Sequence, residues 1–460
     1  GTSAGSFTNN AAGGQVWNNN AGGVININNN SVKGIACCVP FNNAGTFNLN
    51  AGQVNQLSVF NHSGSMNIAA GATFNHFAAG SNSGTYSIAA GGTLMGSMTD
   101  LTGNSFTNNG TVSLTDLRFA GTAAQSLIGS GTIANLALNN ANGLTLGGDQ
   151  TVTGTLTLTS GRISLGSNDL ILINAALGAL NGGTASNYII TDGTGGFQRS
   201  TPSGGSNYSF PVGTATSFLP VILNNTSGPA ERYRVRVRND VHGEYGAPGV
   251  PTGPVITGEQ VERTWVIEEQ TAGGNQTTVQ LQWNIGDEGA GFVRADCAVH
   301  RYNGLDWIDS AFGPVSGSGP FTRSIAGIGE LREFTVADAS SLLTDLCFGG
   351  VAPGSPCDDN DACTIGDVVD VNCNCAGTAE DTDGDGTIDC ADGCPNDANK
   401  IAAGTCGCGN PEPGTLCDDG DAGTSNDAIN AWCFCEGTPV NCDDGDPCTV
   451  DSFDGIQCVH

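Results

Sequence analysis

The residue types and spacing best suited to chemistry stand in one acidic run, Asp381-Thr-Asp-Gly-Asp-Gly-Thr-Ile-Asp-Cys-Ala-Asp392. Its acids occupy positions 1, 3, 5, 9 and 12 of the run, and Gly386 occupies position 6, where the backbone must turn sharply. Because oxygen ligands at this spacing can surround a hard cation, the run predicts a calcium-binding loop. Aspartate in place of glutamate at position 12 departs from a strict EF-hand. The predicted ligands are Asp381, Asp383, Asp385, the carbonyl of Thr387, Asp389 directly or through water, and Asp392.

Further acids belong to a cysteine unit that occurs three times. Cys357-Asp-Asp-Asn-Asp-Ala-Cys-Thr364 aligns without gaps on Cys417-Asp-Asp-Gly-Asp-Ala-Gly-Thr424, and a third copy begins at Cys442-Asp-Asp-Gly-Asp-Pro-Cys-Thr449. Dense carboxylates without cations would repel one another strongly, so these loops are further, weaker candidates for calcium. For the acidic run 381–392 the alternative is a solvated acidic loop. The candidate ligands are Asp358, Asp359, Asp361, Asp418, Asp419, Asp421, Asp443, Asp444 and Asp446.

Fourteen of the 18 cysteines lie after residue 353, in a stretch with few apolar residues. A segment that cannot build a hydrophobic core is usually held by disulfides, and disulfides persist in an oxidising compartment. Gly423 replaces the cysteine equivalent to Cys363, so the second unit is expected to pair outside itself. Cys297 and Cys347, which precede this region, could bridge each other in an oxidising compartment. The disulfide candidates are Cys297, Cys347, Cys357, Cys363, Cys373, Cys375, Cys390, Cys394, Cys406, Cys408, Cys417, Cys433, Cys435, Cys442, Cys448 and Cys458.

Zinc is a competing interpretation of two cysteine pairs, Cys373 with Cys375 and Cys406 with Cys408. Their CxC spacing differs from the usual CxxC knuckle, and the neighbouring carboxylates are hard ligands. The sequence therefore favours disulfides with calcium over zinc.

The acidic charge is concentrated in the same region. Residues 353–460 carry a net charge of −22, whereas residues 181–352 carry −7 and residues 1–180 carry −1, out of −30 for the 460-residue chain. Such a charge repels nucleic-acid phosphates and anionic membrane surfaces, so no nucleic-acid partner is expected. No apolar run approaches 18 residues, so no direct membrane insertion is expected either.

Residues 1–196 are predicted to form a parallel β-helix. Gly64-Ser-Met-Asn-Ile-Ala-Ala-Gly-Ala-Thr-Phe74 recurs as Gly84-Thr-Tyr-Ser-Ile-Ala-Ala-Gly-Gly-Thr-Leu94, and similar units start 19 to 26 residues apart. A strand this short cannot bury its own apolar face, so neighbouring units must stack, in about eight coils. One aligned position predicts a ladder of side-chain amides, formed by Asn26, Asn48 and Asn67.

The β-helix is predicted to be non-catalytic. Glycan cleavage needs paired carboxylates, or a base with a metal and a cation on one face. Residues 1–180 contain only seven charged residues, which is a poor supply for such chemistry. His62 and His76 are interpreted as polar turn residues rather than metal ligands.

Residues 197–347 are predicted to form an antiparallel β-sandwich, because alternating strands separated by turns replace the repeat. The predicted strands are Tyr233-Arg-Val-Arg-Val-Arg238, Arg263-Thr-Trp-Val-Ile-Glu268, Thr278-Val-Gln-Leu-Gln-Trp283 and Glu333-Phe-Thr-Val336. The predicted core tryptophans are Trp265, Trp283 and Trp307. Four arginines share one strand face, either as a solvated face paired with acids or as a basic ligand strip: Arg232, Arg234, Arg236 and Arg238.

Residues 353–460 are predicted to form a disulfide-rich, calcium-binding region with little regular secondary structure. The predicted fold class of the whole chain is all-β. The predicted units are residues 357–378, 381–408, 417–438 and 442–460.

Motifs in the second and third regions resemble parts of extracellular proteins. Phe210-Pro-Val-Gly213 and Glu333-Phe-Thr-Val-Ala-Asp338 resemble the module that follows β-helical repeats in large secreted surface proteins of Bacteroidota. The cysteine units resemble the short CDDG and CTxD repeats of slime-mould extracellular proteins and bacterial surface proteins. Cys394-Pro-Asn-Asp397 after the acidic run resembles the thrombospondin type 3 repeat, in which loops bind calcium without flanking helices. The Bacteroidota resemblance implies an adhesin-like surface protein exported by the type IX secretion route.

These features predict a secreted, extracellular cell-surface protein with a structural or adhesive role. It is expected to be a subunit or segment of a fibre or appendage that self-associates into a homo-oligomer, with a stalk made rigid by Ca²⁺ and disulfides. A calcium-dependent adhesin that binds cell-surface glycans or other cells is the alternative. A secreted glycan-degrading enzyme is disfavoured, because no credible catalytic cluster stands in the sequence.

Overall fold

The computed structural model describes residues 16–28, 30–35, 40–77, 80–97, 100–271, 273–339, 341, 354–361, 363–369 and 374–460. The chain divides into two compact units, residues 1–350 and 351–460. The fold is all-β, as predicted. Within the described residues the helical segments are two 3-10 turns, η1 (Leu177–Ala179) and η2 (Ile285–Asp287).

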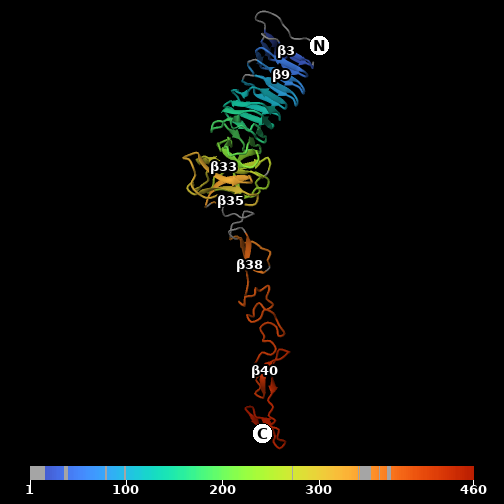
Figure 1. Ribbon diagram of the computed structural model, residues 1–460, viewed down its shortest axis with the longest axis vertical. Helices are drawn as coiled ribbons and strands as arrows, with labels where there is room; N and C mark the ends of the chain where they lie inside the picture. Colours follow the sequence, from blue (N-terminus) through green and yellow to red (C-terminus); the bar gives the residue numbers. More distant parts are fainter. Residues whose placement is uncertain are drawn as a thin grey trace. The chain divides into compact units, whose positions relative to one another are not determined.

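The first unit begins as a β-solenoid of about nine turns, one more than predicted. Its strands stack in parallel on three faces, so that successive rungs of a face come from successive turns of the chain (Figure 1). The first face is one sheet of ten strands: β2 (Val24–Ile27), β5 (Thr46–Leu49), β8 (Ser65–Ile68), β10 (Thr85–Ile88), β12 (Ser105–Asn108), β15 (Gln125–Ile128), β18 (Leu144–Gly147), β21 (Ile163–Ser164), β24 (Ile189–Ile190) and β27 (Val212–Gly213).

The other two faces stack in the same way. The second comprises β3 (Val32–Ile35), β6 (Gln53–Gln56), β9 (Thr73–His76), β11 (Thr93–Gly96), β13 (Thr111–Leu114), β16 (Thr132–Ile133), β19 (Gln150–Val152), β22 (Leu170–Leu172) and β25 (Phe197–Thr201). The third comprises β1 (Trp17–Asn19), β4 (Phe41–Asn43), β7 (Phe60–His62), β14 (Leu117–Phe119), β17 (Leu136–Asn139), β20 (Leu156–Ser160) and β23 (Leu180–Gly182). Single bridges at Asn82 and Leu101 link β7 to β14.

Alternation along each strand directs every second side chain into the solenoid. Phe47, Met66, Tyr86 and Phe106 stand in register on four successive rungs and are buried. Burying a large apolar side chain stabilises the fold by about 1.5–3 kcal/mol, a gain that one short strand cannot obtain without its neighbours. Stacking is therefore what makes these strands stable.

The predicted amide ladder is present on the outer surface. Asn48 Nδ2 donates to Asn26 Oδ1 at 2.7 Å, and Asn67 Nδ2 donates to Asn48 Oδ1 at 2.8 Å. The ladder confirms the register that the repeats predicted.

The interpretation of His62 and His76 as turn residues was wrong, because both are fully buried at the ends of β7 and β9. Period two places them inside, since His62 follows the buried Phe60 by two positions. The His62 ring lies 3.0 Å from both Asn43 Nδ2 and the Thr85 carbonyl, so it is held as a neutral donor and acceptor. Burial lowers the pKa of both histidines.

Two antiparallel sheets follow the solenoid, as predicted. One contains β29 (Glu231–Arg238), β32 (Thr264–Glu269), β37 (Glu333–Asp338), β34 (Cys297–Tyr302) and β35 (Trp307–Asp309). The other contains β26 (Tyr208–Phe210), β28 (Val221–Ser227), β33 (Gln276–Trp283) and β36 (Phe321–Ile328), and a short ribbon joins β30 (Val241–His242) to β31 (Val255–Ile256). Trp265 and Trp283 are fully buried in the main core, and Trp307 is buried in a second, smaller cluster.

The boundary predicted between residues 196 and 197 is not a break in the structure. β25 pairs in parallel with β22 of the solenoid and antiparallel with β29, so one sheet runs through both parts. Arg234 of β29 also pairs with Asp169 at 3.0 Å and with Glu268 at 2.5 Å. The solenoid and the sandwich therefore form one continuous unit, and this arginine serves in structural ion pairs.

Where the structure describes it, the second unit contains three two-stranded hairpins and otherwise little regular structure (Figure 1). The hairpins are β38 (Thr364–Val369) with β39 (Cys375–Ala379), β40 (Thr424–Ile429) with β41 (Cys435–Pro439), and β42 (Ser452–Phe453) with β43 (Cys458–Val459). One hairpin falls in each copy of the cysteine unit.

Candidate metal sites and their disulfide frame

Among the described residues, six disulfides join the loops and hairpins of the second unit. Each hairpin has its own bridge: Cys357–Cys375, Cys417–Cys435 and Cys442–Cys458. Three more bridges involve the segment between the first two hairpins: Cys363–Cys390, Cys394–Cys408 and Cys406–Cys433. The first two hairpins correspond in their own bridges, which both span 18 residues, whereas their outgoing bridges leave from different positions, Cys363 in the first and Cys433 in the second.

The observed disulfide pairing tests several predictions made from the cysteine positions. Cys433 bonds to Cys406 outside its own unit, as the glycine at position 423 requires. The predicted bridge at Cys297 is wrong: this thiol is free and fully buried in β34, where burial raises its pKa to about 11. Cys448 was also a disulfide candidate, and it is a free, exposed thiol. Cys347 and Cys373 lie outside the described residues.

Three aspartates of the acidic run converge. Oxygens of Asp381, Asp383 and Asp385 lie within 4.8 Å of one another. Backbone N–H groups fix the carboxylates: Gly384 donates to Asp381 at 2.8 Å, and Thr387 donates to Asp385 at 2.7 Å. One oxygen, Asp383 Oδ2, is buried and has no hydrogen-bond partner among the described residues. An oxygen in that state fits a cation ligand, because a buried acceptor otherwise needs a donor.

Two other predicted ligands of this loop, Asp389 and Asp392, are not members of the cluster. Asp389 accepts hydrogen bonds from the Thr382 N–H at 2.8 Å and from its hydroxyl at 2.6 Å. These hydrogen bonds lower the pKa of Asp389. Asp392 is buried and accepts from the Cys394 N–H at 2.8 Å, and its second oxygen has no hydrogen-bond partner in the described part of the chain. The structure thus groups three of the acids that the loop pattern placed around one ion.

The first hairpin brings Asp358, Asp359 and Asp367 together, again within 4.8 Å. The Asp359 carboxylate accepts from the N–H groups of Asp361 and Gly377 at 2.9 and 3.0 Å, and these bonds lower its pKa. Asp367 accepts from the Asp359 N–H at 3.2 Å through one oxygen. Its other oxygen is buried without a hydrogen-bond partner among the described residues.

The second hairpin repeats this arrangement with Asp418, Asp419 and Asp427. Asp419 accepts from the N–H groups of Asp421 and Gly437 at 2.9 and 2.8 Å. One oxygen of Asp427 is buried and without a hydrogen-bond partner among the described residues, as is the equivalent oxygen of Asp367 in the first hairpin. Two copies of the motif therefore build the same carboxylate cluster.

The third hairpin gathers a different set, Asp444 with Asp451 and His460. His460 Nδ1 lies 2.9 Å from Asp451 Oδ1 and 3.6 Å from Asp444 Oδ2. The hydrogen bond to Asp451 raises the pKa of His460. An imidazole thus belongs to the third cluster, whereas the clusters of the first two hairpins contain carboxylates alone.

Sequence reasoning identified some cluster members and missed others. Asp361, Asp421, Asp443 and Asp446 were candidates, and they stand outside the clusters. Asp367, Asp427 and Asp451 were missed. The signal was available: each unit carries an aspartate two or three residues after its CT or GT threonine, as in Thr364-Ile-Gly-Asp367.

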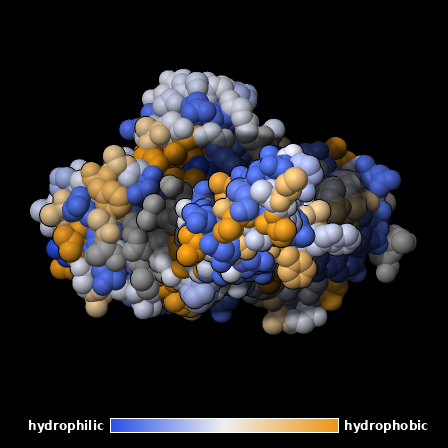
Figure 2. Space-filling view, turned by 90° about the horizontal axis from the view of Figure 1, so that it is seen from below, coloured by the Kyte–Doolittle hydropathy of each residue, from blue (hydrophilic) through white to orange (hydrophobic). Residues whose placement is uncertain are grey.

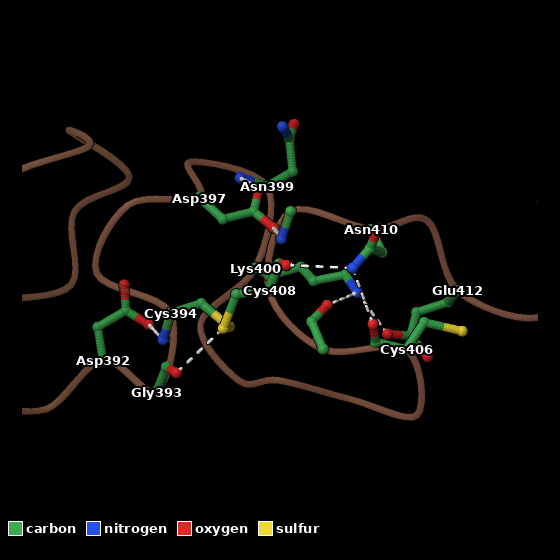
Figure 3. The surroundings of a disulfide bond; sticks show 12 residues. Asp392, Gly393, Cys394, Asp397, Asn399, Lys400, Cys406, Cys408, Asn410 and Glu412 are labelled. Atoms are coloured by element: carbon green, nitrogen blue, oxygen red, sulfur yellow. Dashed lines mark hydrogen bonds and ion pairs between the residues drawn. A yellow bond between two sulfur atoms is a disulfide. The ribbon is translucent and has the colours of Figure 1, made fainter. Parts of the chain in front are cut away.

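Lys400 anchors the segment between the first two hairpins (Figure 3). Its Nζ donates to the Gly407 carbonyl at 2.9 Å and pairs with Glu412 at 2.5 Å, beside the Cys394–Cys408 bridge. The hydrogen bond from Lys400 lowers the pKa of Glu412. Because Lys400 is the only lysine or arginine of residues 353–460, the carboxylate clusters have no lysine or arginine of this region to neutralise them.

Comparisons with protein-family models, with curated proteins and with solved structures find no match for this chain. Across the described residues no helix is long and apolar enough to cross a membrane. The functional argument therefore rests on the fold and on the clusters.

Proposed function

We propose that this chain is a secreted, non-enzymatic protein of the cell surface, and a subunit or segment of an extracellular fibre or appendage. A β-solenoid with many disulfides fits an extracellular structural or adhesive protein. Six disulfides suit an oxidising exterior. The proposal includes kinship with Bacteroidota surface proteins and export by the type IX route, for which the sequence motifs are the support.

We also infer that the acidic clusters bind Ca²⁺, which makes the second unit rigid. The observation that carries this inference is the repetition of one cluster in two hairpins, each with a buried carboxylate oxygen that lacks a hydrogen-bond partner in the described structure. Carboxylate-only clusters suit hard cations. Affinities of the extracellular class, about 10⁻⁴ to 10⁻³ M, would be sufficient outside the cell.

The state of the charged side chains in the first unit supports a non-catalytic role. Arg118 pairs with Asp100, and Arg234 engages Asp169 and Glu268. General acid–base catalysis needs carboxylates that are free to exchange protons with a substrate. Ion pairs of this kind engage these carboxylates in holding strands together.

Self-association is proposed through the open end of the stack. In the described part of the chain, β1, β2 and β3 each pair with one neighbour only. Val24 and Val32 on these strands are 60% and 63% exposed. Unpaired strand edges are templates for further pairing, so a second copy is the expected partner.

Electron microscopy of the purified chain tests the proposal. Fibres or ordered oligomers are expected in millimolar Ca²⁺, and chelation with EDTA should disorder the second unit without dissolving the solenoid. A chain that stays monomeric at high concentration with calcium present contradicts the fibre role. A second unit whose protease resistance ignores EDTA contradicts the calcium assignment.

A further inference from the structure

The turn between β40 and β41 presents two large aromatic side chains to solvent. Trp432 is 80% exposed and Phe434 is 70% exposed. The tryptophans of the sandwich, by contrast, are buried, with Trp265 and Trp283 fully enclosed. On the face drawn in Figure 2, hydrophobic residues lie in small groups among hydrophilic ones. Because packing within the chain does not explain this exposed pair, it is a candidate contact surface.

This aromatic tip, formed by Trp432 and Phe434, is held rigidly. Cys433 between the two aromatics has a φ of 65° and is bonded to Cys406. Asn430 Oδ1 accepts from the N–H groups of Trp432 at 2.9 Å and Phe434 at 3.1 Å. A docking element that is already ordered loses little conformational entropy when it binds.

The first hairpin shows that the fold does not require aromatics at this turn. Gap-free alignment places Asn372 opposite Trp432 and Asn374 opposite Phe434. The two hairpins share their bridge spacing and strand register, with Thr364 opposite Ala379 and Thr424 opposite Pro439. The aromatic pair is therefore an addition to a hairpin that forms without it.

The charge around the aromatic tip selects the kind of partner. Residues 353–460 hold 23 acidic residues and one lysine, and Lys400 is occupied by Glu412 and the Gly407 carbonyl. Glu436, two residues beyond Phe434, is held by Asn430 at 2.7 Å. A negative field repels anionic partners and attracts cations. Among cations, the arginine guanidinium stacks on aromatic faces and also donates to carboxylates.

We propose that the aromatic tip docks an arginine-rich segment of a partner protein. Guanidinium groups stack on Trp432 and Phe434, and neighbouring carboxylates accept their N–H donors. This inference rests on the adhesive role proposed above, for which it names a partner chemistry. Tryptophan anchors of this kind contribute a large share of the energy of protein interfaces.

Binding of two synthetic peptides to the full chain tests the inference. An arginine–glycine repeat peptide and a lysine–glycine repeat peptide of equal charge are compared by biolayer interferometry in physiological salt with Ca²⁺. The test variant carries Trp432→Asn and Phe434→Asn, which copies the residues of the first hairpin. The control variant, Ile456→Asn, removes an apolar side chain that is 88% exposed in the third unit. Peptide mapping of the six disulfides verifies that each variant is folded.

The inference expects the arginine peptide to bind more tightly than the lysine peptide, with a loss of at least about tenfold in the double variant and none in the control. If both peptides bind equally and the double variant retains that binding, the inference is wrong, because the negative charge alone then accounts for binding. Absence of peptide binding overturns it too. If the chain binds neutral glycans on an array through the same two aromatics and binds neither peptide, the proposal of an arginine-rich protein partner is wrong and the partner is a sugar. A calcium response that persists in any of these cases leaves the calcium assignment standing.

Discussion

Replacing Asp383 by asparagine should stabilise the calcium-free loop and weaken its response to calcium. Asp383 shares its cluster with Asp381 and Asp385, whose oxygens lie within 4.8 Å. Two like charges at about 4 Å repel by about 1 kcal/mol in water and about 4 kcal/mol at an effective dielectric constant of 20. Because Asp381 is exposed and the other two are half-buried, the lower figure applies. Removing one charge therefore relieves two repulsions and should stabilise the calcium-free loop by about 2 kcal/mol.

Calcium narrows the difference in stability between the variant and the wild type. If the dissociation constant is about 10⁻⁴ M, 10 mM Ca²⁺ stabilises the wild-type loop by about 2.7 kcal/mol through mass action. A tenfold weaker site in Asp383→Asn gains only about 1.4 kcal/mol under the same conditions. The variant should thus begin more stable in EDTA and respond about half as strongly to calcium.

Hydrogen exchange of the full chain, read by mass spectrometry, measures both quantities. The informative amides are those of Gly384, Gly386 and Thr387, which donate to the cluster carboxylates. Asp389→Asn is the matched control, because Asp389 bonds to Thr382 outside the cluster. Equal calcium responses of the wild type and Asp383→Asn, or an unchanged stability in EDTA, would refute the reasoning. A control that loses the calcium response would place Asp389 among the ligands.

Three further predictions concern the frame and the core. Removing the Cys363–Cys390 bridge with paired serines should cost about 3.5 kcal/mol of local stability for a loop of this span, whereas Cys448→Ser should cost nothing; native-state proteolysis measures both. Gly437→Ala should open the second hairpin and abolish its calcium response in isothermal titration, because an added Cβ would overlap Asp427 Oδ1 and Thr424, and an undisturbed response would contradict the site geometry. Burial lowers the pKa of His62, His76 and His300, the last to about 4, so the stability that these neutral rings contribute is complete above pH 6.5 and is lost as the pH falls below it. Thermal unfolding followed through the buried tryptophans should therefore shift downward from pH 7 to pH 4, and less so in His300→Gln.

The solenoid could be predicted from sequence because each turn repeats the same physical requirement. The alignment of Asn26, Asn48 and Asn67 is sufficient to set the register that the hydrogen bonds display. The strand pairing where the repeat ends could not be predicted in the same way. β25 pairs with a parallel strand, β22, along one edge and with an antiparallel strand, β29, along the other. The residues of β25 alone do not indicate this change of strand direction.

The buried histidines show a second limit. Composition suggests that a histidine in a polar, glycine-rich segment lies in a turn. The phase of the strand places His62 inside, and the amide of Asn43 with the carbonyl of Thr85 makes burial tolerable. Those partners lie 19 and 23 residues away along the chain, on neighbouring turns. Their proximity follows only from the stacked structure.

The carboxylate clusters depend on backbone shape as well as on acidic residues. In the first two hairpins one residue with positive φ, Gly366 at 67° or Asn426 at 56°, forms a bulge directly before the clustered aspartate. Glycine and asparagine adopt this conformation most readily, so the sequence specifies the bulge. The third copy lacks that residue, and its aspartate follows Thr449 by two positions rather than three. There the partner of the carboxylates is His460, so one sequence motif builds two kinds of acidic cluster, and the bulge distinguishes them.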